Sequence, residues 1–416
     1  MTVGRLLELI LRGPTRLRSR EFSGRVRTYR GTAPTWPIAT DPGPLRRGEE
    51  EVLEVSAGSW SHGLELAGGG RRVRPGPPAQ PWWELDRPGI QEHLDPGLLL
   101  SSLYDLRAAE GVRGPVLRGK VIPNSDMDEL AALVYGGGGD GWQGVVDPRL
   151  GVLLDARWIR AGRVGFRSEL ALELRGRPQP PPRPLPEWEA ALESMAGASA
   201  ALRRTDFRAR VVVSYAPEAV SVARERHPAS TFSGGFEWRG WRRRLFPVGV
   251  RGIAQEWASL EDHARRLDPE LPQPPGAGFD SAAQLVVRRG TWEARVLPVR
   301  SELDPYGFGS GGPCGPGWLR DGRTRPPEPA LGEMLDPVLV LASVRLRRVR
   351  PAPDGWRILG TPRPADRAHG YGASVVHPRG DRWEAVVDRD TGALLHCRTL
   401  RRSRELSAHR LTLERI

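Results

Sequence analysis

The feature that most constrains this chain is an internal duplication. When the chain is shifted so that Leu94 falls on Leu335, the decapeptide LDPGLLLSSL falls on LDPVLVLASV. The same shift, without a gap, brings Trp142 onto Trp383 and the tetrapeptide GVLL onto GALL. A repeat of this length indicates one structural unit encoded twice. The two halves of the sequence are therefore expected to share one fold.

The repeat divides the chain into two domains. At 416 residues the chain is long for one hydrophobic core and comfortable for two. The match continues upstream with gaps, because the second copy carries insertions between its early strands. We predict a first domain at residues 1–176, a linker at 177–186 and a second domain at 187–416, with its largest insertion at about 214–283.

The linker reads RPQPPPRPLP, a composition that favours polyproline II. Such a segment can be a ligand for a proline-recognition domain or a semi-rigid spacer. We favour the spacer.

Each copy is predicted to combine an N-terminal helix with a long antiparallel sheet. Apolar residues recur at helical spacing from Val3 to Leu11, and Trp188–Leu202 occupies the equivalent place in the second copy. Short strands follow, and the last of them are joined by turns of the form Asp-x-x-x-Gly, at Asp147 and at Asp388. Strands joined by such short turns are antiparallel. The fold class is therefore α+β.

A short apolar helix is predicted in the middle of each copy. Asp95 and Asp336 are suitable N-caps, and the proline after each suits the first helical position. The helices are expected at Leu98–Leu106 and Leu339–Leu346.

This order of elements resembles the lipoprotein-carrier (LolA-like) fold family, in two tandem copies. The resemblance rests on the leading helix, the early strands, the apolar helix after Asp-Pro and the hairpins around the Asp-x-x-x-Gly turn. It implies a strongly curved sheet, an incomplete β-barrel, whose apolar hollow is plugged by helices and holds acyl chains. Carriers of the family are exported single modules, whereas this chain has two modules and no recognisable export signal.

The resemblance implies that an apolar or lipid-like small molecule binds in each hollow, beneath the plug helix. The alternative is a hollow filled by the protein's own side chains, among them Leu100. The ligand-binding candidates are Leu98, Leu99, Leu103 and Trp142 in the first copy and Leu339, Val340, Val344 and Trp383 in the second.

A second candidate surface lies in the insertion of the second copy. Arg and Trp side chains alternate there, and both are enriched at protein interfaces. A protein partner is one interpretation, and packing of the loop against its own domain is the other. The partner-binding candidates are Trp238, Trp241, Arg242, Arg243, Arg244 and Trp257.

No catalytic signature is found. Gly307–Gly312 has the spacing of a dinucleotide loop, but neither a strand before it nor a helix after it is predicted, so we expect a loop. Asp126, Asp128 and Glu129 have no acidic counterparts in the second copy, and the eight histidines lack metal-ligand spacing. We expect no enzyme, no metal and no cofactor.

The basic charge does not indicate a nucleic-acid partner. The net charge is +12, but Lys120 is the only lysine, and the arginines are interleaved with Asp and Glu along the chain.

The segment Met1–Gly13 lacks the features of a signal peptide, and no apolar run reaches the roughly 20 residues of a membrane span. A cytoplasmic protein is therefore expected.

The functional prediction is a non-enzymatic protein that holds or senses an apolar ligand. The alternative is a regulatory, sensor-like module that binds a protein partner through the Arg/Trp insertion.

Overall fold

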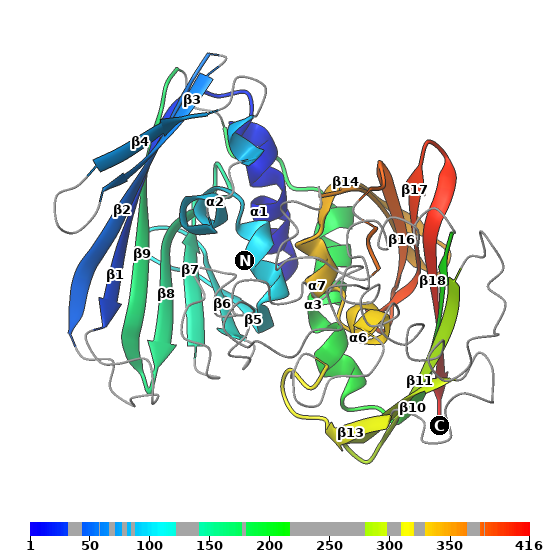
Figure 1. Ribbon diagram of the computed structural model, residues 1–416. Helices are drawn as coiled ribbons and strands as arrows, with labels where there is room; N and C mark the ends of the chain where they lie inside the picture. The colour runs from blue at the N-terminus through cyan, green and yellow to red at the C-terminus, as the bar shows by residue number, and fades with distance from the viewer. Residues whose placement is uncertain are drawn as a thin grey trace, which may run out of the picture. The chain divides into compact units, whose positions relative to one another are not determined.

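The chain forms two compact units, residues Met1–Glu193 and Ser194–Ile416 (Figure 1). The computed structural model describes residues 1–31, 44–57, 59–65, 71–76, 81–84, 88–121, 141–176, 180–216, 279–297, 309–319, 329–363, 375–377 and 379–416. Within these residues each unit holds one nine-stranded antiparallel sheet, and the two end strands of each sheet do not pair with each other. The predicted α+β class, with two tandem curved sheets that are not closed into barrels, is confirmed.

Unit 1 begins with a long α-helix. Two short 3-10 helices and one short α-helix lie between its fourth and fifth strands. Its elements are α1 (Val3–Leu17), β1 (Phe22–Gly31), β2 (Leu45–Ser56), β3 (Ser59–Glu65), β4 (Arg71–Pro75), η1 (Trp82–Glu84), α2 (Pro88–Leu94), η2 (Pro96–Ser101), β5 (Leu103–Ala109), β6 (Val116–Val121), β7 (Gly141–Val146), β8 (Leu153–Arg160) and β9 (Arg163–Leu174).

Unit 2 repeats this order. The division between the units falls within α3 (Pro186–Leu202). The other elements are β10 (Phe207–Tyr215), β11 (Phe279–Arg288), β12 (Thr291–Leu297), β13 (Gly309–Pro313), α6 (Pro329–Leu335), α7 (Val338–Leu341), β14 (Val344–Ala352), β15 (Gly355–Pro362), β16 (Arg382–Asp388), β17 (Leu394–Arg401) and β18 (Arg404–Arg415).

The two sheets have the same strand order and the same register. The order is β4-β3-β2-β1-β9-β8-β7-β6-β5 in unit 1 and β13-β12-β11-β10-β18-β17-β16-β15-β14 in unit 2. Phe22 of β1 lies opposite Leu174 of β9, and the residues that the repeat aligns with them, Phe207 and Arg415, lie opposite each other in unit 2. The last strand of each unit therefore lies at the centre of the sheet, next to the first strand.

The β-bulges recur as well. The register shifts between Val145 and Val146 in the β7–β8 pair, and between Val386 and Val387 in the β16–β17 pair. A bulge bends its strand and increases the local twist, so its position fixes where a sheet curves. Both sheets therefore bend at the same place in the repeat.

The Asp-x-x-x-Gly turns form as predicted. Asp147 Oδ1 accepts hydrogen bonds from the backbone N–H groups of Arg149 and Leu150, and the turn ends at Gly151 with φ of 71°. In unit 2 the turn from Asp388 ends at Gly392 with φ of 73°. Aspartate accepts such local bonds readily, and glycine adopts positive φ without a steric penalty.

The described part of the linker lies against α1 rather than projecting from it. Arg5 donates a 2.9 Å hydrogen bond to the carbonyl oxygen of Pro182, and Arg12 donates one of 3.0 Å to that of Arg183. Between them the fully buried carboxylate of Glu8 accepts bonds from both arginines and from the backbone N–H of Leu185. These residues of the linker are thus a fixed part of unit 1.

The predicted helices after the Asp-Pro pairs are only partly correct. Helical structure ends at Ser101 in unit 1 and at Leu341 in unit 2, and strands begin at Leu103 and Val344. The side chain of Asp95 makes no capping hydrogen bond. The apolar run was compatible with either structure, and pairing with β6 and with β15 decides for strand in its second half.

Candidate functional site

The candidate site is the apolar face of each sheet together with the short helices that cover it. In unit 1, α2 contacts β1, β2 and β8, and in unit 2, α6 contacts β10, β11, β17 and β18 (Figure 1). These helices were missed by the sequence analysis, although Pro88 and Pro329 begin them and the repeat aligns the two prolines. Their apolar residues are too few to produce a clear helical period.

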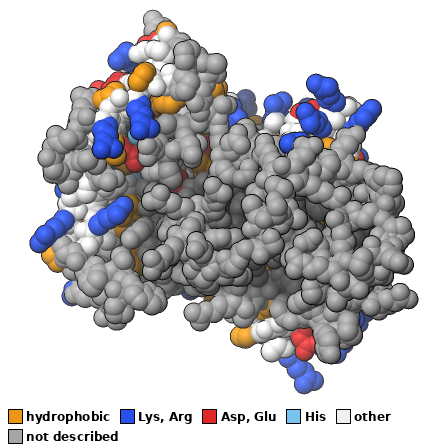
Figure 2. Space-filling model, viewed as in Figure 1, with side chains coloured by type: hydrophobic (Ala, Val, Ile, Leu, Met, Phe, Trp, Pro, Cys, Tyr) orange, Lys and Arg blue, Asp and Glu red, His pale blue; other side chains and the backbone are white. Residues whose placement is uncertain are grey.

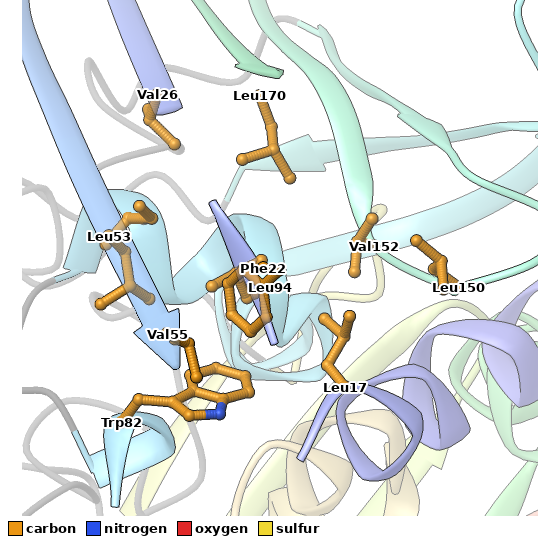
Figure 3. Close-up of a cluster of buried hydrophobic side chains, with 11 residues drawn as sticks. Leu17, Phe22, Val26, Leu53, Val55, Trp82, Leu94, Leu150, Val152 and Leu170 are labelled. Carbon is orange, nitrogen blue, oxygen red and sulfur yellow. The ribbon is translucent and has the colours of Figure 1, made fainter. Parts of the chain in front are cut away.

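A cluster of buried side chains fills the space beneath α2 in unit 1 (Figure 3). From α2 come Ile90 and Leu94, which are at most 1% exposed, and from the sheet come Phe22, Val26 and Leu53, which are fully buried. The cluster also contains Trp82, whose ring meets that of Phe22 edge to face at a centroid distance of 5.1 Å. The remaining members are Leu17, Val55, Leu150, Val152 and Leu170.

The ligand-binding candidates of unit 1 lie on the other half of the sheet. Leu98 and Leu99 belong to η2, Leu103 begins β5 and Trp142 lies on β7; all four are buried, and none is a member of the cluster in Figure 3. Here η2 contacts α1 and β5 rather than α2 alone. Their role in binding stays a prediction.

The candidates of unit 2 occupy equivalent places. Val340 of α7, Val344 of β14 and Trp383 of β16 are fully buried, whereas Leu339 of α7 is half-buried. Trp383 Nε1 donates a 3.2 Å hydrogen bond to the carbonyl oxygen of Val375, which satisfies its polar atom inside the core. Their role in binding is likewise a prediction.

A histidine fastens α2 to the sheet. His93 Nδ1 lies 2.7 Å from the carbonyl oxygen of Leu153, and His93 Nε2 lies 2.8 Å from Ser168 Oγ on β9. Because a carbonyl only accepts, Nδ1 carries the proton and Nε2 accepts from the hydroxyl. Burial lowers the pKa of His93 to about 4, so the ring is neutral at pH 7.

A serine hydroxyl bonded to a neutral imidazole is the first pair of a hydrolase triad. His93 and Ser168 are both fully buried beneath α2, however, so a substrate carbonyl cannot approach the hydroxyl. The pair therefore has a structural role, because it holds α2 against the sheet.

A second buried polar pair lies beside α2. His62 Nε2 lies 3.3 Å from Glu51 Oε2, and the side chains of His62 and Glu51 are 7% and 17% exposed. The carboxylate of Glu51 lies against Gly89 of α2. The alternation of β2 places Glu51 on the same face as Leu53 and could have identified it from the sequence.

Unit 2 fastens its short helix differently. Glu333 of α6 is 3% exposed and accepts a 2.9 Å hydrogen bond from the backbone N–H of Val375. The last strand, β18, contacts α6 and carries His409, which is fully buried, and burial lowers its pKa to about 3. Burial, with a contribution from the charge of Glu333, raises the pKa of the Cys397 thiol well above its usual value, which makes a reactive thiolate unfavourable.

On the opposite, outer face of the sheets, buried carboxylates are covered by arginines. Glu384 in unit 2 accepts hydrogen bonds from Arg357 and Arg398, and Asp155 in unit 1 accepts them from Arg157 and Arg167. Burial raises the pKa of each carboxyl, but the arginine hydrogen bonds and charges outweigh it, so that the pKa is lowered. Basic side chains stand out at the margins of the view in Figure 2. Part of the arginine excess thus neutralises acids within the fold.

Other predicted features lie elsewhere. The partner-binding candidates Trp238, Trp241, Arg242, Arg243, Arg244 and Trp257, the predicted insertion except for its ends, and Asp126, Asp128 and Glu129 lie outside the described residues. The expected loop at Gly307–Gly312 is wrong from Gly309 onward, because Gly309–Pro313 forms strand β13. The described ranges contain no group of three or more His, Cys, Asp or Glu side chains placed to hold a metal ion.

No described helix combines the length and the apolar character that crossing a membrane requires.

The comparisons with known proteins give little guidance. No protein-family model and no curated protein matches the chain. Matches among solved structures include the complex of Pseudomonas aeruginosa MucA/MucB, at a TM-score of 0.24 and 17% identity over 42% of this chain and 58% of the other. They also include MucB in complex with MucA(peri), at a TM-score of 0.23 and 18% identity over 42% of this chain and 56% of the other.

The chain thus spans little more than half of each of these proteins. TM-scores this low do not establish a common fold. The resemblance to the lipoprotein-carrier family stays a prediction, and the antiparallel curved sheets stand on their own strand pairing.

Proposed function

We propose that this protein is a non-enzymatic binding protein and that each unit receives an apolar or lipid-like ligand between its sheet and the short helices over it. The observation that carries the proposal is the recurrence, in two diverged copies, of an apolar sheet face covered by a separate seven-residue helix, α2 or α6. The proposed ligand-binding residues are the side chains beneath the short helices together with the candidates predicted from the sequence, Leu98, Leu99, Leu103, Trp142, Leu339, Val340, Val344 and Trp383.

A seven-residue helix is a weak cover. Isolated helices shorter than about 12 residues are marginal in water, so α2 is held in place by its contacts with the sheet. Lifting α2 would expose Phe22, Val26 and Leu53. An acyl chain laid on these side chains would restore the buried apolar area, at about 25 cal/mol per Å².

The alternative function is a module that binds a protein partner and keeps both apolar faces closed. The dense packing of Ile90 and Leu94 on the sheet in unit 1 favours this alternative. The Arg/Trp insertion remains the proposed contact surface for such a partner. The ligand-binding function and the partner-binding function predict different properties for the purified protein.

Native mass spectrometry of the full chain, purified after cytosolic expression, separates the two functions. A co-purifying apolar molecule that organic extraction removes is expected. Titration with the apolar probe N-phenyl-1-naphthylamine gives a second measurement, since its fluorescence increases in apolar sites. A chain that carries no apolar molecule and does not bind the probe overturns the proposal in favour of the partner-binding function.

Two truncations of the cover make the test specific. Ile90→Ala removes a fully buried anchor of α2, and Leu331→Ala removes the aligned anchor of α6. Such truncations leave cavities and weaken the cover, at about 2 to 5 kcal/mol each. Each variant should therefore bind the probe more tightly than the native chain. If both variants fold and bind the probe no more tightly than the native chain, the short helices do not control access of the ligand to the apolar face of the sheet.

A further inference from the structure

Three polar residues at the α2 side of unit 1, Glu51, His62 and His93, are replaced by apolar residues in unit 2. The strand pairing places His62 opposite Leu53, and in unit 2 the aligned position opposite Leu285 is Ala294. Glu51 lies opposite Leu64, and its aligned residue is Ala283, opposite Val296. Both alanines are buried, at no more than 3% exposed. A largely covered Glu–His pair in one copy is thus an Ala–Ala pair in the other.

The short helix also differs between the units at the positions next to this pair. Gly89 leaves room for the Glu51 carboxylate, since a Cβ at this position would lie 2.8 Å from Glu51 Oε1. The aligned residue of α6 is Ala330, which is fully buried, and α6 contacts β11, the strand that carries Ala283. His93 is replaced in the same way by Met334, also fully buried. The differences are therefore coordinated between neighbouring residues.

Unit 2 shows that the fold does not require these polar groups. Burying a polar group costs free energy even when it is paired, and an apolar replacement of similar shape is often neutral. The presence of Glu51 and His62 in unit 1 therefore calls for a role other than folding.

We propose that unit 1 is the copy that discriminates among ligands, and that it takes an amphiphile with a cationic, hydrogen-bond-donating end such as a primary alkyl amine. This inference rests on the proposed function. If α2 lifts, the groups that lose its cover are the Glu51 carboxylate, the Ser168 hydroxyl and the Leu153 carbonyl oxygen. Each can accept a hydrogen bond, and an ammonium group has N–H donors and the positive charge that the Glu51 carboxylate prefers.

The charge of Glu51 is available for this role. The outer-face carboxylates Glu50, Asp155 and Glu384 are each covered by two or more arginines. Glu51 instead pairs with the imidazole of His62. An anionic head group at this place would meet the carboxylate of Glu51 and be repelled.

The variant that tests the inference copies unit 2 into unit 1: Glu51→Ala, His62→Ala and Gly89→Ala together. Because Ala283, Ala294 and Ala330 already occupy these places in the same fold, the triple variant is expected to fold. Its matched control is Glu54→Gln, which removes one charge from β2 on the outer face.

The measurement is displacement of N-phenyl-1-naphthylamine from the full chain by dodecylamine, dodecanol and dodecanoate. The native chain and the control should release the probe at a concentration of dodecylamine about tenfold lower than of dodecanoate, a factor worth about 1.4 kcal/mol. In the triple variant the two concentrations should agree to within about threefold, while the probe itself still binds.

The outcomes separate the two proposals. Probe binding without an amine preference, or an amine preference that survives in the triple variant, overturns this inference and leaves the proposed function standing. Absence of probe binding in every form removes the proposed function and this inference with it.

Discussion

Gly151 and Gly392 show how single residues determine the packing of each unit. Both have positive φ, and a Cβ at either position would overlap a backbone carbonyl oxygen of the unit's leading helix, that of Leu9 or that of Ser194. The repeat aligns these helix residues with each other, as it aligns the two glycines. The Asp-x-x-x-Gly turn is therefore both a hairpin turn and the contact through which helix and sheet meet at backbone distance.

Gly151→Ala is expected to destabilise unit 1 by at least about 3 kcal/mol, because strain at positive φ and overlap with the helix add together. The control is Gly162→Ala, which has φ of 77° but nothing within 4 Å of the added Cβ. It should cost only the backbone strain, about 1 to 2 kcal/mol. Urea unfolding followed by tryptophan fluorescence measures both. Equal costs would show that the close contact with Leu9 is not what requires glycine.

At the scale of elements, the short helices and the sheet are joined by few polar contacts. In unit 1 the bond from His93 to Leu153 and the bond from Ser168 to His93 tie α2 to β8 and β9. Ile90 and Leu94 add apolar contact between α2 and the sheet. The stability of the cover is therefore expected to depend on the protonation of one imidazole.

Burial lowers the pKa of His93 from 6.5 to about 4, so acid should loosen α2. Below pH 6.5 the unfolded state binds a proton that the closed form excludes until about pH 4. The stabilisation is thus complete above pH 6.5 and is lost as the pH falls, by roughly 3 kcal/mol. Hydrogen exchange of the α2 and β9 amides at several pH values measures this opening.

The matched variant is His93→Met, the residue found at the aligned position of unit 2. It should be less stable than the native chain at pH 7, because Ser168 loses its partner, at about 1 to 3 kcal/mol. Its exchange rates, corrected for intrinsic pH effects, should change less between pH 7 and pH 4. An undiminished pH dependence would assign the acid sensitivity to other groups, such as His409 of unit 2.

At the scale of the whole molecule, each unit closes by pairing its first strand with its last. β9 pairs with both β1 and β8, so it lies in the middle of the sheet although it is the last strand of the unit in sequence. Contacts between distant parts of a chain form slowly and all at once. A unit is therefore expected to be unstable until its final strand is present.

Three truncated chains test this closure. Residues 1–160 lack β9 and should not fold, whereas residues 1–193 should unfold cooperatively in urea. Residues 1–176 keep the sheet but lose the linker backbone that Arg5, Arg12 and Glu8 bind, and should be less stable than 1–193 by about 1 to 3 kcal/mol. If 1–176 and 1–193 are equally stable, the linker is a spacer, as predicted from the sequence.

The sequence by itself determined the repeat, the α+β class and the local elements whose signals are short in range. The leading helices α1 and α3, the strands that start at Phe22 and Phe207, and the Asp-x-x-x-Gly turns follow from periodicity and from turn residues. These signals are local because helix periods and turns involve residues a few positions apart.

Only the tertiary structure decided where the apolar run after Asp95 changes from helix to strand, and which polar residues meet beneath α2. The helical part of this run ends at Ser101, because the residues from Leu103 onward pair with strand β6. Glu51, His62, His93 and Ser168 are far apart in sequence and come together only through the strand pairing and the seating of α2. Strand alternation can mark Glu51 as inward-facing, but pairing partners from other segments leave no periodic signal in the chain, so which residues meet beneath the helix could be found only from the fold.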